Sequence, residues 1–260
     1  MKIITVNINK GGTGKSTISY NLANWIAEKK NKKVLLIDGD HSCNLSYSFS
    51  NLGEENILNI FKGKPAKIYP VSDNLDFIKG SKNLKDDFLK LKDRQNNCMI
   101  MFMWFADNME SLEKYDYVII DTHNDTSLVT SNFLAVSDMV IGVSEPSRNG
   151  YRAWLELKAT IEHLKSELVD VRSRESYITT KPYLIGNRVE HNTNSSKEFL
   201  ETLEDEPDFI GMIQKKELLA QSLLKNENIF SYDKKTIKNH ELFYNNIETV
   251  FDKILSEINK

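Results

Sequence analysis

The glycine-rich segment KGGTGKST, residues 10–17, is the feature that most constrains how this chain folds. It follows a short apolar run, IITVNI, and precedes a stretch with helical spacing, so it predicts a turn between a strand and a helix. Successive backbone N–H groups of such a turn are free to surround a phosphate, and the helix dipole favours the negative charge. The segment therefore predicts an α/β fold with a phosphate-binding loop after its first strand.

Each position of this loop has a chemical reason. Gly11, Gly12 and Gly14 permit positive φ and a close approach of the backbone to a phosphate. Lys15 is expected against the β- and γ-phosphates, and the Ser16 hydroxyl is suited to Mg²⁺. The loop therefore predicts a nucleoside triphosphate and Mg²⁺ as ligands.

A second lysine makes the loop unusual. The strict P-loop pattern requires glycine where this chain has Asn9, and Lys10 stands at the head of the loop. One lysine is enough for the chain's own nucleotide, so Lys10 is expected to have another task. The segment resembles the deviant Walker A motif of the ParA and MinD family of ATPases. The resemblance implies that Lys10 reaches the partner's nucleotide in an ATP-dependent homodimer, that Thr17 faces the α-phosphate, and that Thr13 belongs to the ATP-binding loop.

Two aspartates lie at the end of the second expected strand, in the segment VLLIDGDHSCN. The carboxyl ends of strands form the ligand edge of an open α/β sheet. The segment resembles the family motif D-x-D-P-Q-G-N, with HSC at residues 41–43 in place of Pro-Gln-Gly. By this match Asp40 positions the attacking water, Asp38 supports the magnesium and its waters, and Asn44 reads the state of the γ-phosphate.

A third acidic strand end occurs in YDYVIID, which closes on Asp121. It resembles a Walker B strand, and the resemblance implies that the carboxylate binds Mg²⁺ through a water. His123 follows where the family has proline. Because phosphoryl transfer depends on positioning more than on proton shuttling, His123 is expected to be a solvent-side loop residue.

Asn187 ends a late apolar strand in the segment YLIGNR. Its position resembles that of the family's base-reading asparagine, whose amide offers both a donor and an acceptor to adenine. The alternative is an asparagine that only starts a turn.

Short apolar strands alternate with longer helical stretches along the chain, which is typical of a parallel sheet with crossover helices. The expected strands span residues 3–8, 33–38, 75–79, 116–121, 138–144, 182–187 and 208–213. The expected helices span residues 15–29, 84–92, 97–113, 150–169, 195–204, 216–225 and 240–259. No linker or repeat divides the chain, so residues 1–260 predict a single ParA-like P-loop NTPase domain of the α/β class. Its mostly parallel twisted sheet is expected to carry helices on both faces, without an N-terminal DNA-reading domain.

Composition excludes several classes of protein. The formal net charge is -3, so any contact with nucleic acid must come from a local patch. Cys43 and Cys98 lie far apart, which favours a reducing cytoplasm over a disulfide framework. The longest apolar run, residues 98–106, has about half the length that a membrane span requires.

Three kinds of ATPase are candidates on these residues. A ParA-type ATPase drives plasmid or chromosome partition: it hydrolyses ATP slowly, binds DNA nonspecifically and is stimulated by a centromere-binding adaptor. A MinD-like membrane-cycling or protein-positioning ATPase is the alternative, but the polar side of residues 240–260 is largely acidic, which an anionic membrane would repel. An ATPase like the nitrogenase iron protein needs two cysteines near the dimer axis, which Cys43 and Cys98 do not match.

A partition ATPase needs a cationic surface. Between residues 208 and 240, six lysines face four acidic residues. The expected DNA contacts are Lys215, Lys216, Lys225, Lys234, Lys235 and Lys238, with Arg148 and Arg152. An ordinary solvated surface is the competing interpretation of such charges. As a partition ATPase, the protein is expected to be cytoplasmic and associated with the nucleoid, and no membrane contact is expected.

Overall fold

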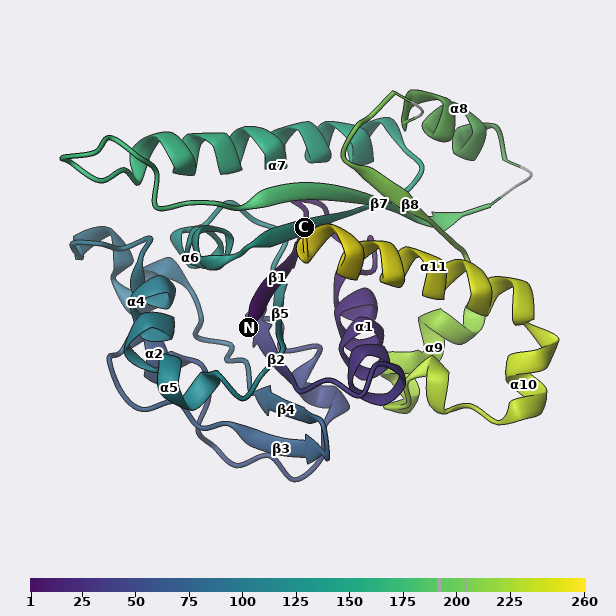
Figure 1. Cartoon of the computed structure of the whole chain (residues 1–260), viewed down its shortest axis with the longest axis horizontal. Helices are drawn as coiled ribbons and strands as arrows, with labels where there is room; N and C mark the ends of the chain where they lie inside the picture. The colour runs from purple at the N-terminus through teal and green to yellow at the C-terminus, as the bar shows by residue number, and fades with distance from the viewer. Residues whose placement is uncertain (191–192, 204) are drawn as a thin grey trace.

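A computed structural model describes residues 1–190, 193–203 and 205–260, and one eight-stranded sheet runs through these residues (Figure 1). The strand order is β3-β4-β2-β5-β1-β6-β7-β8, and every neighbouring pair is parallel except β3 and β4. The strands are β1 (Lys2–Asn7), β2 (Val34–Gly39), β3 (Tyr69–Ser72), β4 (Leu75–Ile78), β5 (Tyr117–Thr122), β6 (Met139–Ser144), β7 (Lys181–Val189) and β8 (Phe209–Gln214). The predicted α/β class is confirmed.

Helices cover both faces of the sheet. One face carries α1, α9 and α11, and the other carries α2, α4, α6, α7 and α8, as Figure 1 shows. The helices are α1 (Lys15–Lys29), α2 (Leu58–Phe61), α3 (Asp86–Leu89), α4 (Ile100–Asp107), α5 (Met109–Leu112), α6 (Leu128–Val136), α7 (Arg148–Glu167), α8 (Asn194–Leu203), α9 (Glu217–Lys225), α10 (Lys234–Asn239) and α11 (Glu241–Ile258). Because both faces are covered, β2, β5 and β6 are buried along their whole length and read as continuous apolar runs.

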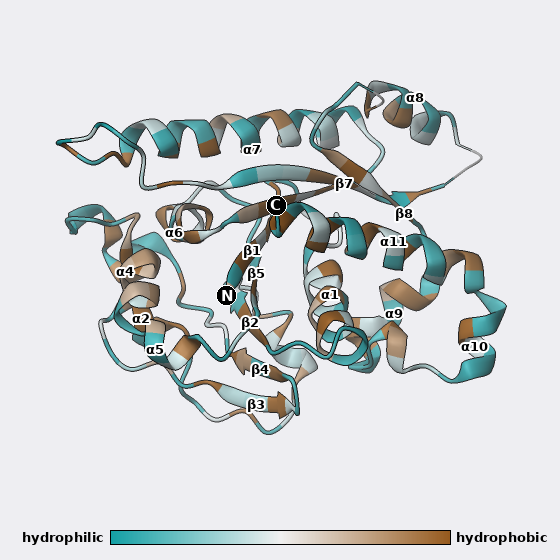
Figure 2. Cartoon of the chain, in the orientation of Figure 1, coloured by the Kyte–Doolittle hydropathy of each residue, from teal (hydrophilic) through white to brown (hydrophobic). Residues whose placement is uncertain are grey.

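The last helix packs on the sheet with its apolar stripe. Phe243, Ile247, Phe251, Ile254 and Ile258 are all buried in α11. Hydrophobic and hydrophilic residues alternate along this helix and along α7 in Figure 2, as the one-sided burial requires. Within the described residues, no helix combines the length and the apolar character that a membrane span demands.

Two predicted helices are wrong in extent. The helix expected over 84–92 is interrupted at Lys90, whose φ of 50° is left-handed, so α3 ends at Leu89 and a short 3₁₀ turn follows. The helix expected over 97–113 is divided at Asn108 into α4 and α5. In both places a non-helical backbone angle interrupts a sequence whose apolar spacing suggests one continuous helix.

Four elements were not predicted: β3, α2, α6 and α10. β3 is an antiparallel edge strand that contains Pro70, a residue that sheets accept only at such edges. α6 has the sequence LVTSNFLAV, in which three polar residues interrupt the apolar spacing, and the Ser127 side chain caps its first turn by accepting a hydrogen bond from the Thr130 N–H. The other strand boundaries agree with the prediction within two residues, and residue 204 of the expected helix 195–204 lies outside the described residues.

Candidate functional site

The loop of residues 10–17 joins the end of β1 to the start of α1, as the sequence predicts. Gly12 and Gly14 adopt φ of 76° and 96°, which side chains rarely tolerate. Gly14 is the N-cap of α1, and no side chain caps this helix end. The first amides of α1 are therefore available to an anion, in a loop whose conformation requires glycine.

Lys15 points into this loop. It is 7% exposed, and its Nζ donates to the backbone oxygen of Lys10 over 3.2 Å. Burial lowers the pKa of Lys15, whereas the negative charges of Asp121, Asp40 and Asp125 raise it. A cation held among acids at the head of an uncapped helix fits a polyphosphate.

Two buried carboxyl groups lie side by side at the ends of β2 and β5, because Asp38 and Asp121 are register partners. Burial raises the pKa of Asp38 to about 6. Burial first, and then the charge of Asp38, raise the pKa of Asp121 to about 7, while the nearby Ser16 hydroxyl opposes the shift. Asp121 Oδ1 accepts a hydrogen bond from Ser19 Oγ over 3.0 Å, but the buried Oδ2 has no partner among the described residues. This oxygen, beside Ser16, fits a hydrated divalent cation.

Asp38 also fixes the loop that follows β2. Its Oδ2 accepts hydrogen bonds from the N–H and the Oγ of Ser46 over 2.8 and 2.6 Å, and its Oδ1 accepts from the Asp40 N–H over 3.1 Å. Both oxygens therefore already have protein donors. Direct magnesium ligation fits Asp121 better than Asp38, which lies behind the site. Asn44, two residues before Ser46, is exposed.

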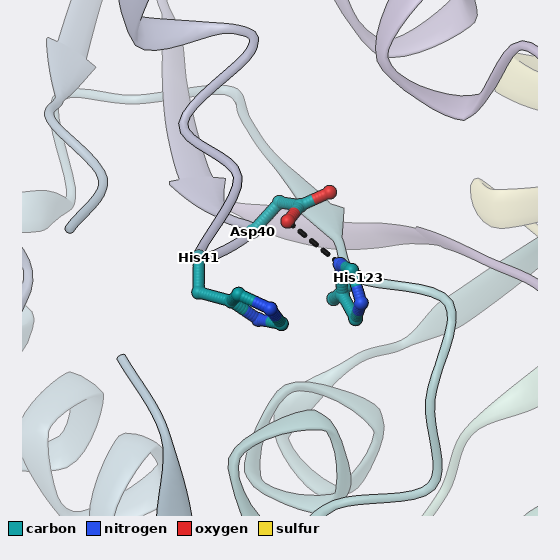
Figure 3. A group of neighbouring side chains, drawn as sticks. All are labelled: Asp40, His41 and His123. Carbon is teal, nitrogen blue, oxygen red and sulfur yellow. Dashed lines mark hydrogen bonds and ion pairs between the residues drawn. The ribbon is translucent and has the colours of Figure 1, made fainter. Parts of the chain in front are cut away.

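Asp40 lies in a cluster with two histidines (Figure 3). Asp40 is 6% exposed, its Oδ1 accepts a hydrogen bond from the Ser42 N–H over 2.7 Å, and the same oxygen lies 2.8 Å from His123 Nδ1. The ring centroids of His41 and His123 are 3.9 Å apart. Burial and the charge of His123 lower the pKa of His41. His123 is a loop residue, as expected, and its side chain is 24% exposed, but it also contacts Asp40, the carboxylate assigned to the attacking water.

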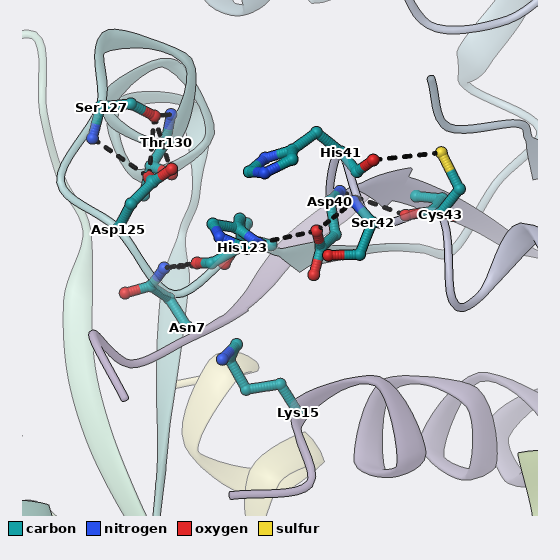
Figure 4. A network of polar contacts seen from close by, with 12 residues as sticks. Asn7, Lys15, Asp40, His41, Ser42, Cys43, His123, Asp125, Ser127 and Thr130 are labelled. Atoms are coloured by element: carbon teal, nitrogen blue, oxygen red, sulfur yellow. Dashed lines mark hydrogen bonds and ion pairs between the residues drawn. The ribbon is translucent and has the colours of Figure 1, made fainter. Parts of the chain in front are cut away.

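A polar network surrounds this cluster (Figure 4). Asn7 Nδ2 donates to the backbone oxygen of His123 over 3.2 Å, which ties the end of β1 to the loop after β5. Asp125 accepts hydrogen bonds from the hydroxyl groups of Ser127 and Thr130 over 2.8 and 2.6 Å. These contacts order residues 123–127, a loop for which the sequence predicts no site residue.

The ammonium group of Lys10 lies outside the phosphate loop. Its Nζ is 2.5 Å from Glu145 Oε1 and 2.8 Å from Ser147 Oγ, just after the end of β6. The side chains of Lys10 and Glu145 are 21% and 32% exposed. Lys10 therefore has partners in its own subunit that lie outside the loop, and Glu145 and Ser147 are site residues that sequence reasoning missed.

A cavity of about 600 Å³ opens beside the P-loop, at the ends of β7 and β8. Its walls include Gly14, Thr17 and Asn187. Asn187 is 3% exposed, and its Nδ2 donates to the Thr13 backbone oxygen over 2.8 Å, while its Oδ1 has no partner among the described residues. One N–H of the amide is used by Thr13, so the Oδ1 acceptor and the second N–H of Nδ2 remain for a base. The size and place of the cavity suit a nucleoside next to the phosphate loop.

The basic residues expected to contact DNA fall into two groups. Lys215 pairs with Glu190 at 2.7 Å, Arg152 pairs with Glu156 at 3.0 Å, and Lys216 lines the cavity. The others, Lys225, Lys234, Lys235 and Lys238, are exposed on α9 and α10 and form no ion pair within the described part of the chain. We call these four the α9–α10 lysine patch.

Known proteins resemble this chain over most of its length. A family model described as an AAA domain, of the ParA and MinD type, matches residues 1–172. An uncharacterised ATP-binding protein of Methanocaldococcus jannaschii is 31% identical over 251 residues, which cover 92% of this chain and 85% of that protein. The chromosome-partitioning ATPase Soj of Thermus thermophilus is 26% identical over 163 residues, 61% of each chain.

A solved structure agrees with these similarities. A plasmid partition protein from Borrelia burgdorferi, bound to AMPPNP, matches with a TM-score of 0.76 and 25% identity over 98% of both chains. The P-loop at the end of β1, the acidic ends of β2 and β5 and the family match over residues 1–172 lead to one conclusion. The chain belongs to the ParA and MinD family of P-loop ATPases.

Proposed function

We propose that this protein is a switch that dimerises when it binds ATP, hydrolyses the ATP slowly, and in this way partitions a plasmid or a chromosome. The position of Lys10 carries the proposal. Lys15 Nζ lies within the phosphate loop, 3.2 Å from the backbone oxygen of Lys10, whereas Lys10 Nζ is held outside the loop by Glu145. The chain therefore holds a second cation beside its phosphate site, paired with Glu145 at the protein surface, and we assign this cation to the nucleotide of a second copy.

We also propose roles for the other residues of the site. We assign the phosphates to Lys15, Thr17 and the loop amides of residues 11–16, and the magnesium to Ser16 and Asp121 with Asp38 behind them. When bound, Mg²⁺ neutralises charge on the phosphates. Asp40 orients the attacking water, because its carboxylate, unlike that of Asp38, is not held on both oxygens by Ser46 and the neighbouring backbone.

The nucleoside has a separate place. We assign the base to the cavity beside Gly14 and Thr17, where the Asn187 Oδ1 is the available acceptor. This acceptor matches the exocyclic amino group of adenine, which is a donor. Asn44 is assigned to sensing the γ-phosphate, as its exposure allows movement.

The DNA part of the proposal rests on the relatives and on the α9–α10 lysine patch. Soj is a chromosome-partitioning ATPase, and the Borrelia protein is a plasmid partition protein. Exposed lysines without ion pairs contact phosphates without reading sequence. We assign sequence recognition to a centromere-binding adaptor, which also stimulates hydrolysis. The ATP dimer then works in the cytoplasm on the nucleoid.

The substitution Lys10→Ala tests the proposal. The variant should bind ATP within a few fold of wild type, because Lys15 and the loop amides remain, but it should stay monomeric with ATP and lose hydrolysis. Sedimentation velocity with ATP and with ADP measures the change. Lys64→Ala, which removes an exposed lysine after α2, is the matched control and should dimerise normally. Dimerisation of Lys10→Ala to the wild-type extent would contradict the proposal.

A further inference from the structure

Asp40, His41 and His123 form a cluster in which two histidines, neither assigned to ATP or magnesium, lie beside the Asp40 carboxylate. We propose that these three side chains bind one transition-metal dication of the zinc class. Their ligand atoms lie within 4.8 Å of one another. The residues come from two different loops, after β2 and after β5, which meet because β2 and β5 are neighbours in the sheet.

The geometry leaves nitrogen lone pairs available. His123 Nδ1 lies 2.8 Å from Asp40 Oδ1, a separation that two ligand atoms of one ion can adopt, and Nδ1 carries a lone pair when the neutral ring is protonated on Nε2. The His41 ring has no hydrogen-bond partner among the described residues, and its contact is with the His123 ring, 3.9 Å away between centroids. Figure 3 shows both rings on the same side of the Asp40 carboxylate.

The ligand set selects the kind of ion. Imidazole suits Zn²⁺, Ni²⁺, Cu²⁺ and Co²⁺, whereas Mg²⁺ prefers oxygen ligands in an octahedron. Two imidazoles and one carboxylate make a three-ligand set that leaves a position for water or another oxygen, as in open zinc sites. The cluster is therefore distinct in chemistry from the oxygen site at Ser16 and Asp121.

The surroundings favour a cation that can enter from solvent. The His123 side chain is 24% exposed and the Asp40 side chain 9% exposed, so the cluster opens to solvent on the histidine side. The acidic groups around the cluster are Asp38, Asp121 and Asp125, and the basic groups are Lys15 and Lys85. With Asp40, the acids outnumber the lysines.

A bound ion would occupy the carboxylate that we assign to the attacking water. Zinc is therefore expected to stop ATP hydrolysis while leaving the phosphate loop intact. This consequence rests on the proposed function, whereas binding of the ion does not.

The test is titration of the full chain, without nucleotide and in excess Mg²⁺, with Zn²⁺ by calorimetry. Wild type should bind one zinc, and His41→Gln and His123→Gln should each weaken binding by about 10–100-fold. His163→Gln, which removes an exposed histidine from α7, is the matched control and should bind like wild type. Absence of zinc uptake by wild type, or an equal decrease in all three variants, would overturn the site.

Two further measurements keep the outcome decisive. A glutamine variant that unfolds at a lower temperature than wild type by circular dichroism cannot be compared with it. The absorption spectrum of wild type with Co²⁺ then tests the site: strong visible bands support it, and only weak octahedral bands refute it. Zinc should also inhibit hydrolysis of saturating Mg-ATP in wild type more than in the two histidine variants. Zinc uptake without inhibition would count against the role of Asp40 and not against the metal site.

Discussion

Two buried carboxyl groups make the stability of the nucleotide-free protein depend on pH. The folded-state pKa of Asp38 is about 6 and that of Asp121 is about 7. Both lie above the value of about 3.9 for an aspartate in an unfolded chain. The folded state therefore holds extra protons between about pH 4 and pH 7, and the free energy of unfolding falls as the pH rises through this window.

Asp38→Asn should remove part of this dependence. Between pH 5 and pH 7.5, wild type should lose roughly 1–2 kcal/mol more free energy of unfolding than the variant, because the variant has no charge to bury. Urea titrations at the two pH values, without nucleotide or magnesium, measure the difference. Asp107→Asn, at an exposed position, should keep the wild-type dependence. Equal pH slopes in wild type and Asp38→Asn would show that Asp38 does not titrate in this range.

At the residue scale, the sequence was informative where partners lie close along the chain. The loop of residues 10–17 and the pair Asp38 and Asp40 are local motifs, and the structure brings them together. The contacts of Lys10 with Glu145 and of Asp40 with His123 span 135 and 83 residues, so no local pattern shows them. The histidines in place of the family's prolines were the available signal for the second contact.

At the scale of elements, α11 is the helix whose environment decides between packing and membrane contact. Phe251 is fully buried, and its ring centroid lies 5.5 Å from that of Trp25 and 6.2 Å from that of Phe230. Phe251→Ala should therefore lower the free energy of unfolding by about 3–5 kcal/mol. Urea unfolding followed by tryptophan fluorescence measures the decrease.

Leu242 provides the control for this prediction. It lies on the same helix and is 83% exposed, so Leu242→Ala should change stability by less than about 0.5 kcal/mol. A decrease for Phe251→Ala as small as that for Leu242→Ala would mean that α11 is not docked on the sheet in solution.

Among the strands, those with long apolar runs were predictable from the sequence. Strands with two covered faces, such as β2 and β5, have continuous apolar runs that identify them in the sequence. The edge strand β3 has one buried residue, Tyr69, and its sequence YPVS has no such run. The interruptions at Lys90 and Asn108 depend on backbone angles that apolar spacing does not encode.

At the scale of the whole molecule, the α9–α10 lysine patch makes a prediction about DNA. The ATP dimer should bind any duplex similarly and bind more weakly as salt increases, because the patch offers interactions with phosphates only. The double variant Lys234→Glu and Lys235→Glu should weaken binding to every sequence about equally. It should also lower the log-log salt slope by about 0.9 for each phosphate that the variant no longer neutralises. Fluorescence anisotropy at several salt concentrations measures both effects.

A variant with the same change in charge controls for net charge. Lys64→Glu with Lys67→Glu alters exposed positions between α2 and β3 and should bind DNA nearly as wild type does. Both double variants should still dimerise with ATP. A wild-type dimer that ignores DNA at low salt, but associates with anionic vesicles through residues 240–260, would favour the membrane-cycling alternative.

The place of β1 in the sheet has a consequence for how the protein is made. β1 pairs with β5 on one side and β6 on the other, through partners such as Lys2 with Tyr117 and Ile4 with Met139. On the ribosome, this apolar strand has neither neighbour until β5 has left the exit tunnel, and both only after β6 has followed. The glycine loop gains its acidic neighbours at the same late stage. Nascent chains that stop before β6 should therefore expose β1 and lack the nucleotide site. Binding of ATP should then distinguish complete chains from truncated ones.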